Sequence, residues 1–473
     1  MSLHPDRLFA SCPQQRALAR ELYEAVKALP IVSPHGHTDA RWFADNRAFP
    51  NATALLLQPD HYLLRMLYSQ GVSLSALGIA SLDTADAGAP RASIADPEQA
   101  WLCFADHYHL FRGTPTQQWM DHVFSEVFGL PERFCADNAR EFYTLINRAL
   151  ATPAFLPRAL FERFNIEVLA TTESPLDTLQ AHQRLRDDPW PGRVITAFRP
   201  DPVLDPDYEG FVGNIQKMEQ LSGVACDTWR GYLQALRERR QFFRSLGATS
   251  TDHGHPTPFT ADLPLAQCET LYAGALVGSL CAADAELFRG QMLLEMAQMS
   301  LDDGLVMQIH PGVYRNHNPS LFAHYGRDRG ADIPGATEYV RNLKPLLDKV
   351  GNNADFTLIL FTLDEATYAR ELAPLAGHYP AVRLGPPWWF HDSPEGMLRY
   401  RQQTSETAGF YNTVGFNDDT RAFLSIPARH DMARRMDCRF LAQWVSEHRL
   451  CMDDAHALAR DSAGDLARKA YRL

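Results

Sequence analysis

The chain has 473 residues and a formal net charge of −12, with 45% hydrophobic and 22% charged residues. This is ordinary globular usage, and the length suits either one large barrel with insertions or two domains of common size. The acidic balance argues against a nucleic-acid partner, because phosphate binding needs a basic face. No run of about 18 apolar residues occurs, so we expect no segment that spans a membrane.

The spacing of the cysteines indicates in which cellular compartment the protein acts. Eight are scattered along the chain without CxxC or another metal-like spacing, which is typical of free thiols in a reducing cytoplasm. The N-terminal stretch MSLHPDRLFASCPQQRALARELYEAV is charged and amphipathic, and it lacks the apolar core of a signal peptide. We therefore expect a cytoplasmic protein.

Short apolar, β-branched segments separated by helical patterns are typical of βαβ units. In chain order, the candidate strands are residues 30–37, 166–173, 193–200, 246–254, 305–312, 356–362, 381–389 and 412–421. Most of the spaces hold helical material, such as SPLDTLQAHQRLR at 174–186. Eight strands alternating with helices predict an α/β fold, a (β/α)8 barrel of the TIM type, with a doubly wound sheet as the alternative.

The space between the first two strands is different from the others. Residues 40–158 are mostly helical in pattern and rich in aromatic residues, so we predict a large helical insertion after the first strand. The predicted organisation is a single barrel domain over 1–473, with strands at about 30–37 and 166–421 and a C-terminal helical region at 426–473.

Polar and aromatic side chains stand at the carboxyl ends of nearly all the candidate strands. In a (β/α)8 barrel these ends form one mouth, where active sites lie. In strand order, they are His35, His37, Thr172, Glu173, Arg199, Asp252, His253, His310, Thr362, Trp388, Trp389, Asp418, Asp419 and Arg421.

The pair His35 and His37 indicates a metal site. Residues i and i+2 of a strand point to the same side, and two imidazoles on one side can bind one transition metal. The aspartate that ends the last strand lies beside the first strand in a closed barrel, so Asp419 or its neighbour Asp418 offers a third ligand. The alternative is a pair of hydrogen-bonded histidines in a polar loop.

Nearly the whole chain resembles the uronate isomerase family of the amidohydrolase superfamily. The segments that carry the resemblance are AFPNATALLLQPDHYLLRMLYSQGV (48–72), FNIEVLATTESPLD (164–177), TAFRPD (196–201), TDHG (251–254), VMQIHPGVYRNHN (306–318), WWF (388–390) and DTRAFLSIPARH (419–430). Leu63 and Leu64 stand where many members have Lys-Trp, and GPPWWFHD carries two prolines and a histidine that are not typical of the motif. These departures leave the preferred sugar open.

The resemblance implies one divalent metal ion, usually zinc, bound by His35, His37 and Asp419. It also implies a site that draws on His61, Tyr62, Arg199, Trp388, Trp389 and Arg421. Isomerisation by proton transfer does not strictly require a metal, so we do not expect activity to depend on one absolutely.

The reaction that the resemblance implies is aldose–ketose isomerisation of a hexuronate, from D-glucuronate to D-fructuronate or from D-galacturonate to D-tagaturonate. Transfer of a proton from C2 to C1 through an enediol needs a base, an acid and donors where charge develops. We assign Asp419 as the base, Tyr62 as the proton donor and Arg421 as the group that polarises the oxygen. Arg199 is assigned to the substrate carboxylate, which arginine can bind bidentately.

The remaining candidates are assigned to substrate binding. Trp388 and Trp389 offer an apolar platform for the C–H face of a sugar, and His61, Asp252 and His310 complete the set of candidates. Each also has an ordinary structural reading, namely packing for the tryptophans and internal hydrogen bonds for the others.

Two rival functions remain open at this point. One is a metal-dependent hydrolase on the same barrel, which uses a metal-bound hydroxide; the absence of lysine from the candidate strand ends favours one metal or none. The other is a non-catalytic sugar-acid binder. Because barrel enzymes with long insertions often associate, a homo-oligomer is a further expectation.

Overall fold

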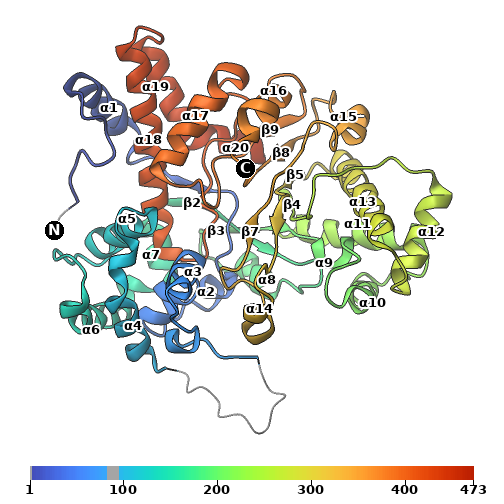
Figure 1. Ribbon diagram of the computed structural model, residues 1–473, viewed down its shortest axis with the longest axis horizontal. Helices are drawn as coiled ribbons and strands as arrows, with labels where there is room; N and C mark the ends of the chain where they lie inside the picture. The colour runs from blue at the N-terminus through green and yellow to red at the C-terminus, as the bar shows by residue number, and fades with distance from the viewer. Residues whose placement is uncertain (1–2, 83–94) are drawn as a thin grey trace.

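The computed structural model describes residues 3–82 and 95–473, and a parallel sheet of seven strands lies at its centre (Figure 1). The strands are hydrogen-bonded in the order β1-β2-β3-β4-β5-β8-β9. Their bounds are β1 Ile31–Ser33, β2 Ile166–Glu173, β3 Arg193–Phe198, β4 Ser250–His253, β5 Val306–Ile309, β8 Leu358–Leu360 and β9 Val382–Leu384. A separate antiparallel ribbon pairs β6 Val313–Tyr314 with β7 Ile333–Pro334.

The predicted eighth strand, 412–421, is present only as a single parallel bridge between Leu384 and Thr413. Gly415 interrupts the extended backbone with φ +74°, so no ladder continues. The segment nevertheless runs back to the first strand, where the carbonyl oxygen of Thr420 accepts a hydrogen bond of 2.9 Å from the backbone N–H of His37. The predicted α/β fold is thus confirmed in its coarse form, a curled, barrel-like parallel sheet. The predicted count of eight strands is wrong, since the sheet has seven.

The alternation of side chains along β2 shows how the sheet positions the site. Val168 and Ala170 pack inside the barrel with Ile195, whereas Leu169 packs outward against the helices that follow β1. A parallel strand covered on both faces carries apolar residues on both sides, as Val168, Leu169 and Ala170 do here. Because side chains alternate, Thr172 at the end of β2 points to the same side as Val168 and Ala170.

The described residues between β1 and β2 form six α-helices, gathered at the lower left of Figure 1, and their aromatic core is continuous with the side chains that the first strands point outward. Trp101, Phe104 and Phe134 pack at its centre. The helices are α2 Ala40–Asp45, α3 His61–Ser69, α4 Pro97–Asp106, α5 Pro115–His122, α6 Ala139–Leu150 and α7 Pro157–Arg163.

The helices after β2 cover the outside of the sheet, and the N-terminal helix α1 (Pro13–Val26) packs on the last long helices (Figure 1). The helices that follow β2 are α8 Gln180–Asp187, α9 Asp201–Leu204, α10 Phe211–Ser222, α11 Trp229–Ser245, α12 Leu265–Leu276, α13 Ala282–Asp303, α14 Pro319–Tyr325, α15 Lys344–Val350, α16 Ala373–Ala376, α17 Pro394–Ala408, α18 Ile426–Ser446, α19 Met452–Arg460 and α20 Leu466–Tyr471. Short 3-10 and π turns lie at Thr53–Leu57, Ser75–Leu77, Tyr108–Phe111, Val123–Val127, Ala136–Asn138, Pro153–Phe155, Tyr368–Leu372, Phe423–Ser425 and Asp461–Asp465.

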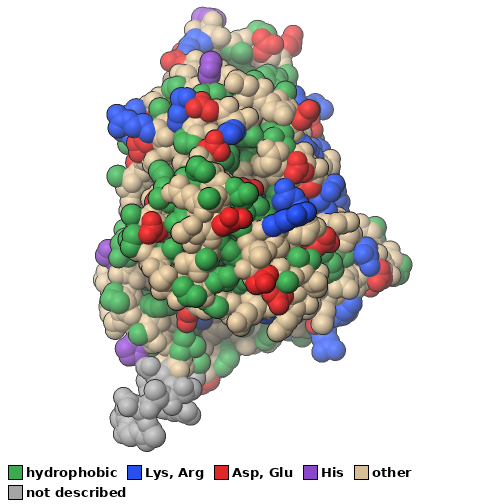
Figure 2. All heavy atoms as spheres, turned by 90° about the vertical axis from the view of Figure 1, so that its right-hand side faces the viewer, with side chains coloured by type: hydrophobic (Ala, Val, Ile, Leu, Met, Phe, Trp, Pro, Cys, Tyr) green, Lys and Arg blue, Asp and Glu red, His purple; other side chains and the backbone are tan. Residues whose placement is uncertain are grey.

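The surface carries both signs of charge. On the face that forms the right-hand side of Figure 1, acidic and basic side chains are intermixed with hydrophobic ones (Figure 2). Among the residues that the structure describes, none of the helices combines the length and the apolar character needed to cross a membrane.

Candidate active site

The carboxyl ends of the parallel strands open into a cavity of about 1140 Å³. The structure brings most of the predicted site residues together on its wall. Those that line it are His37, His61, Tyr62, Arg199, His310, Trp388, Trp389, Asp419 and Arg421. The other two, His35 and Asp252, are buried next to lining residues: His35 contacts Asp419, and Asp252 contacts Arg199 and His310.

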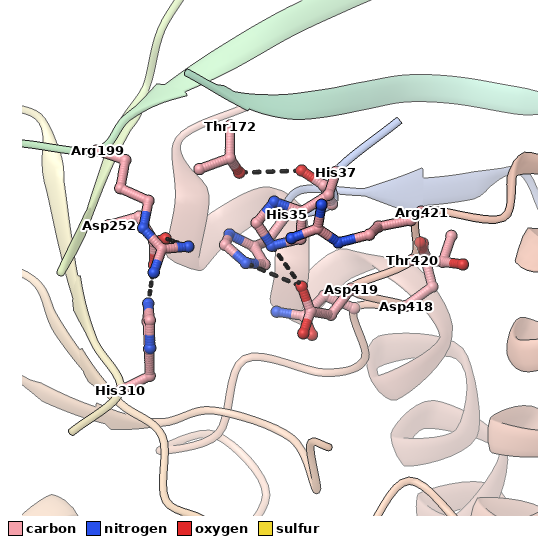
Figure 3. A network of polar contacts seen from close by, with 12 residues as sticks. His35, His37, Thr172, Arg199, Asp252, His310, Asp418, Asp419, Thr420 and Arg421 are labelled. Carbon is pink, nitrogen blue, oxygen red and sulfur yellow. Dashed lines mark hydrogen bonds and ion pairs between the residues drawn. The ribbon is translucent and has the colours of Figure 1, made fainter. Parts of the chain in front are cut away.

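The two histidines after β1 converge on one carboxylate (Figure 3). The Nε2 atoms of His35 and His37 each lie 3.1 Å from Oδ1 of Asp419, and the two rings are 5.3 Å apart at 85°. The adjacent Asp418 turns away and pairs with His430 at 3.0 Å. Asp419 itself has φ +43°, an uncommon conformation for a residue with a side chain and one that recurs at functional sites.

The charges of this cluster follow from burial and from its mutual contacts. Burial alone would raise the pKa of Asp419, but the bonds from His35 and His37 hold it well below its ordinary value, so the carboxylate is ionised. Burial lowers the pKa of His37 to about 4. Burial also acts to lower the pKa of His35, but Asp252 and Asp419 outweigh it and raise that pKa.

The same three side chains fit a metal ion by the chemistry of their donors. Two imidazoles and one carboxylate form a donor set that zinc and related divalent ions accept. One ligand atom from each of His35, His37 and Asp419 lies within 4.8 Å of the other two.

Arg199, which follows β3, is held between two aspartates. Its Nε donates to Oδ2 of Asp201 at 2.9 Å, and one terminal nitrogen lies 3.5 Å from Oδ2 of Asp252. Asp252 also lies 3.0 Å from Nε2 of His310, and these three side chains form one network (Figure 3). Burial acts to lower the pKa of Arg199, but Asp201 and Asp252 outweigh it and raise that pKa, so the guanidinium is charged.

Arg421 is anchored from another loop. One of its terminal nitrogens lies 3.1 Å from Oδ1 of Asp328, and the arginine remains about one-third exposed toward the cavity. Burial would raise the pKa of Asp328, but the charge of Arg421 holds it below its ordinary value. Burial lowers the pKa of His61 to about 3, which keeps this imidazole neutral.

Tyr62 stands in the first turn of α3, where the side chain of Asp60 caps the helix by accepting from the backbone N–H of Tyr62. The hydroxyl donates to Oδ1 of Asp392 at 2.6 Å and accepts from the backbone N–H of Phe390 at 3.0 Å. Asp392 is also bound by Arg429 at 2.8 Å. Burial, then Asp392, raises the pKa of Tyr62 well above its ordinary value, so the phenol keeps its proton.

The two tryptophans occupy different environments on the wall of the cavity. Trp388 is buried and packs edge-on against His310, with ring centroids 4.9 Å apart. Trp389 stacks on Phe390 at 5.1 Å and 13°, with the Arg315 guanidinium 5.9 Å from its ring.

Several lining residues were not among the sequence candidates: Glu173, Arg315, Arg327, Asp328, Asp392 and Arg429. Glu173 did appear as a strand end, and Arg315 and Arg429 lie in segments of the family resemblance, so a signal existed for these three; Asp392 lies two residues beyond the WWF segment. Arg327 and Asp328 lie in a loop after α14 without any motif. Burial raises the pKa of Glu173 to about 7 against hydrogen bonds from Thr196 and Thr171.

A barrel-like parallel sheet whose strand ends present ionised carboxylates, histidines and arginines that face the cavity defines an enzyme that acts on a small anionic substrate. The comparisons with known proteins specify the class further. Residues 13–463 match the family model described as glucuronate isomerase. The chain belongs to the glucuronate isomerase family, also called uronate isomerases, and is an isomerase.

The most similar relatives agree over full length. The chain is 62% identical to a uronate isomerase of Sphingopyxis alaskensis, covering 100% of this chain and 99% of that protein. A crystal structure of glucuronate isomerase from Caulobacter crescentus superposes with a TM-score of 0.97 at 58% identity, covering 100% and 97% of the two chains. A uronate isomerase structure from Thermotoga maritima superposes with a TM-score of 0.91 at 25% identity, covering 100% of both chains. The prediction of a uronate isomerase is thus confirmed, and the rival hydrolase and binder functions are not supported.

Proposed function

We propose that the substrate is a hexuronate in its open-chain aldose form, either D-glucuronate, which gives D-fructuronate, or D-galacturonate, which gives D-tagaturonate. The observation that carries the proposal is the convergence of one ionised carboxylate, Asp419, with two arginines, Arg199 and Arg421, in one cavity. A carboxylate base and cationic donors are what proton transfer next to a carbonyl in an acid substrate requires.

The proposed proton transfer divides between two residues. Asp419 removes the proton from C2 while Tyr62 protonates the carbonyl oxygen at C1, which gives the enediol. Asp419 then returns the proton to C1, and the C2 hydroxyl passes its proton to Tyr62, which leaves the ketone at C2. Arg421 stabilises the negative charge that develops on the oxygens.

The proposed role of Tyr62 is supported by its bond to Asp392. Burial and the neighbouring Asp392 raise the pKa of the phenol, so Tyr62 is protonated and neutral before the transfer. Its hydroxyl lies 2.6 Å from Asp392, which is itself held by Arg429, so the phenol is fixed in orientation. Tyr62 therefore donates its proton from a fixed position within a rigid network of side chains.

Substrate binding is assigned to the groups around this centre. Arg199 binds the substrate carboxylate; its Nε is engaged by Asp201, and the terminal nitrogens keep further N–H donors. Trp388 and Trp389 face the C–H side of the sugar. His61, Asp252 and His310 complete the site, the last two by fixing Arg199.

A metal ion fits the same centre. His35, His37 and Asp419 are its proposed ligands, zinc is the expected ion, and activity is not expected to depend on it absolutely. When bound, such an ion supplies positive charge to the oxygen atoms of the substrate. Asp419 then combines the roles of ligand and base.

The domain organisation belongs to the same proposal. We treat residues 1–473 as one barrel domain, with 40–158 as a helical insertion that brings His61 and Tyr62 to the mouth and 426–473 as a C-terminal helical region. The proposed location is the cytoplasm, and the proposed assembly is a homo-oligomer; neither nucleic acid nor a membrane is a proposed partner.

The test is incubation of the purified protein with each uronate in D2O. NMR follows the C2 proton, and a separate assay detects the ketose. The expected result is exchange of the C2 proton together with ketose formation from at least one of the two acids. Release of a hydrolysis product without exchange, or no reaction of either acid, would contradict the proposal.

A further inference from the structure

The tripeptide His-Gly-His occurs twice in the chain, at 35–37 and at 253–255. The first copy belongs to the site described above, but the second, which begins on the last residue of β4, has no role in the proposed function. The two copies have similar geometry. The rings of His253 and His255 are 6.0 Å apart at 82°, close to the 5.3 Å and 85° of His35 and His37.

An aspartate from a neighbouring strand end completes the second group, as Asp419 completes the first. Asp201 opens α9 directly after β3, and one ligand atom from each of Asp201, His253 and His255 lies within 4.8 Å of the other two. Two imidazoles and a carboxylate are again a donor set for a divalent transition metal.

The histidines of this second group are buried with unused ring nitrogens. His255 is 4% exposed, and neither of its ring nitrogens has a hydrogen-bond partner; His253 is fully buried, and its Nδ1 has none. A buried polar atom left unpaired costs roughly 1–3 kcal/mol. Nε2 of His253 lies 3.0 Å from the Thr251 hydroxyl. A metal-bound histidine typically has this arrangement, with one nitrogen on the metal and the other held by a polar neighbour.

The carboxylate of Asp201 is oriented and still able to bind. Oδ1 accepts from the backbone N–H of Gly254 at 3.0 Å, and Oδ2 accepts from Nε of Arg199 at 2.9 Å. A carboxylate has about four lone-pair sites, so each oxygen keeps one for a further partner. A Cβ at position 254 would lie 2.9 Å from Asp201 and 2.7 Å from both Arg199 and His310, so a larger residue there would force these side chains to shift.

The surroundings of His255 carry an excess of negative charge. The guanidinium of Arg289 is shared by Asp205, Asp207 and Glu286, at 2.8, 2.7 and 3.0 Å. The charged groups that act on His255 are the carboxylates of Asp201, Asp205 and Glu286 and the guanidinium of Arg289. Arg199 pairs with Asp201, and a net negative charge remains around the unpaired ring nitrogens of His255, which favours a bound cation.

We propose that Asp201, His253 and His255 bind a second divalent transition-metal ion of the zinc class, separate from the group formed by His35, His37 and Asp419. The ion gives the buried ring nitrogens a partner and fixes the carboxylate of Asp201. Because Asp201 holds Nε of Arg199, the ion also positions that guanidinium at the cavity; this last step rests on the proposed function, whereas metal binding does not.

The test separates the two metal groups by mutation and measures zinc rather than turnover. Protein stripped with a chelator is equilibrated with micromolar free Zn²⁺, and bound zinc is measured by elemental analysis. For His35→Gln/His37→Gln protein the expected content is one equivalent, which is lost when His255→Gln is added. Zinc should also raise the midpoint of thermal unfolding of His35→Gln/His37→Gln protein, because a bound ion stabilises the folded state. It should not raise that midpoint once His255→Gln is added.

Controls keep the outcome decisive. His122→Gln replaces a histidine whose Nδ1 is likewise buried without a partner but which lies outside both groups, and it should change neither readout. If His255→Gln protein fails to fold by circular dichroism, Asp201→Asn takes its place. A zinc-edge anomalous map of wild-type crystals needs no variant and should show density between the three side chains. No density there, or no zinc in folded His35→Gln/His37→Gln protein, would overturn the proposal.

Discussion

Replacing Tyr62 with phenylalanine tests the proposed division of proton transfer. The substitution removes one oxygen, and with it the bond to Asp392 at 2.6 Å and the bond from the Phe390 backbone at 3.0 Å. Asp392 keeps its ion pair with Arg429, so the buried charge does not become isolated. We therefore expect a loss of stability of about 1–3 kcal/mol from the unpaired groups. Turnover should fall by roughly 10²–10⁴-fold, as for loss of a general acid.

The assay measures ketose formation and exchange of the C2 proton on the same sample, with urea unfolding as the stability readout. Tyr232→Phe is the matched control. The Tyr232 hydroxyl is buried and donates to the carbonyl oxygen of Val203 at 2.7 Å, away from the cavity. Tyr232→Phe should lose similar stability and keep its turnover. Near-wild-type rates of both reactions in Tyr62→Phe protein would refute the acid role and assign it to another group, such as Arg421.

Asp419→Asn should lower turnover by at least about 10²-fold and also lower metal content, since base and ligand are one residue; unchanged kinetics would exclude it as the base. His35→Ala/His37→Ala protein should lose the zinc bound at the cavity, as measured by elemental analysis. Arg199→Met should raise KM for the acid more than it lowers kcat, and an unchanged KM would exclude it as the carboxylate clamp. Glu173→Gln should flatten the pH dependence of unfolding. The folded pKa of Glu173 is raised from 4.5 to about 7, so wild-type stability should fall by about 3 kcal/mol as pH rises through that window, and urea melts at its two ends measure the difference.

The sequence predicted the strands well where they are buried on both faces. The run at 166–173 matches β2 at both ends, because its buried apolar residues Ile166, Val168, Leu169 and Ala170 are followed by β-branched threonines that favour a strand. The stretch at 412–421 was a poorer predictor. Its Gly415 and its five consecutive polar residues from Asn417 to Arg421 suit a loop, and only its role in closing the sheet resembles that of a strand.

Some residues of the candidate site could be predicted from the sequence, and others could not. The spacing of His35 and His37 indicated that they act together, but the predicted strand 30–37 ends at Ser33, and both histidines converge from the loop that follows β1. The choice between Asp418 and Asp419 was not predictable, because it depends on a backbone at φ +43° that turns adjacent side chains apart. Arg327 and Asp328 were also not predictable: they reach the cavity through the fold of a long loop, and pairing between distant segments leaves no periodic signal.

The bond from His37 to Thr420 has a consequence for how the protein acquires activity. The two sides of the proposed centre come from opposite ends of the chain, so the centre has among the largest sequence separations that this fold contains. Contacts of this kind form late, because the loop that they close must first lose its conformational freedom. Helical signal should therefore recover early during refolding, and catalytic activity should recover only with the final closure of the sheet. A chain still emerging from the ribosome would be inactive until its last strand segment is free to pair.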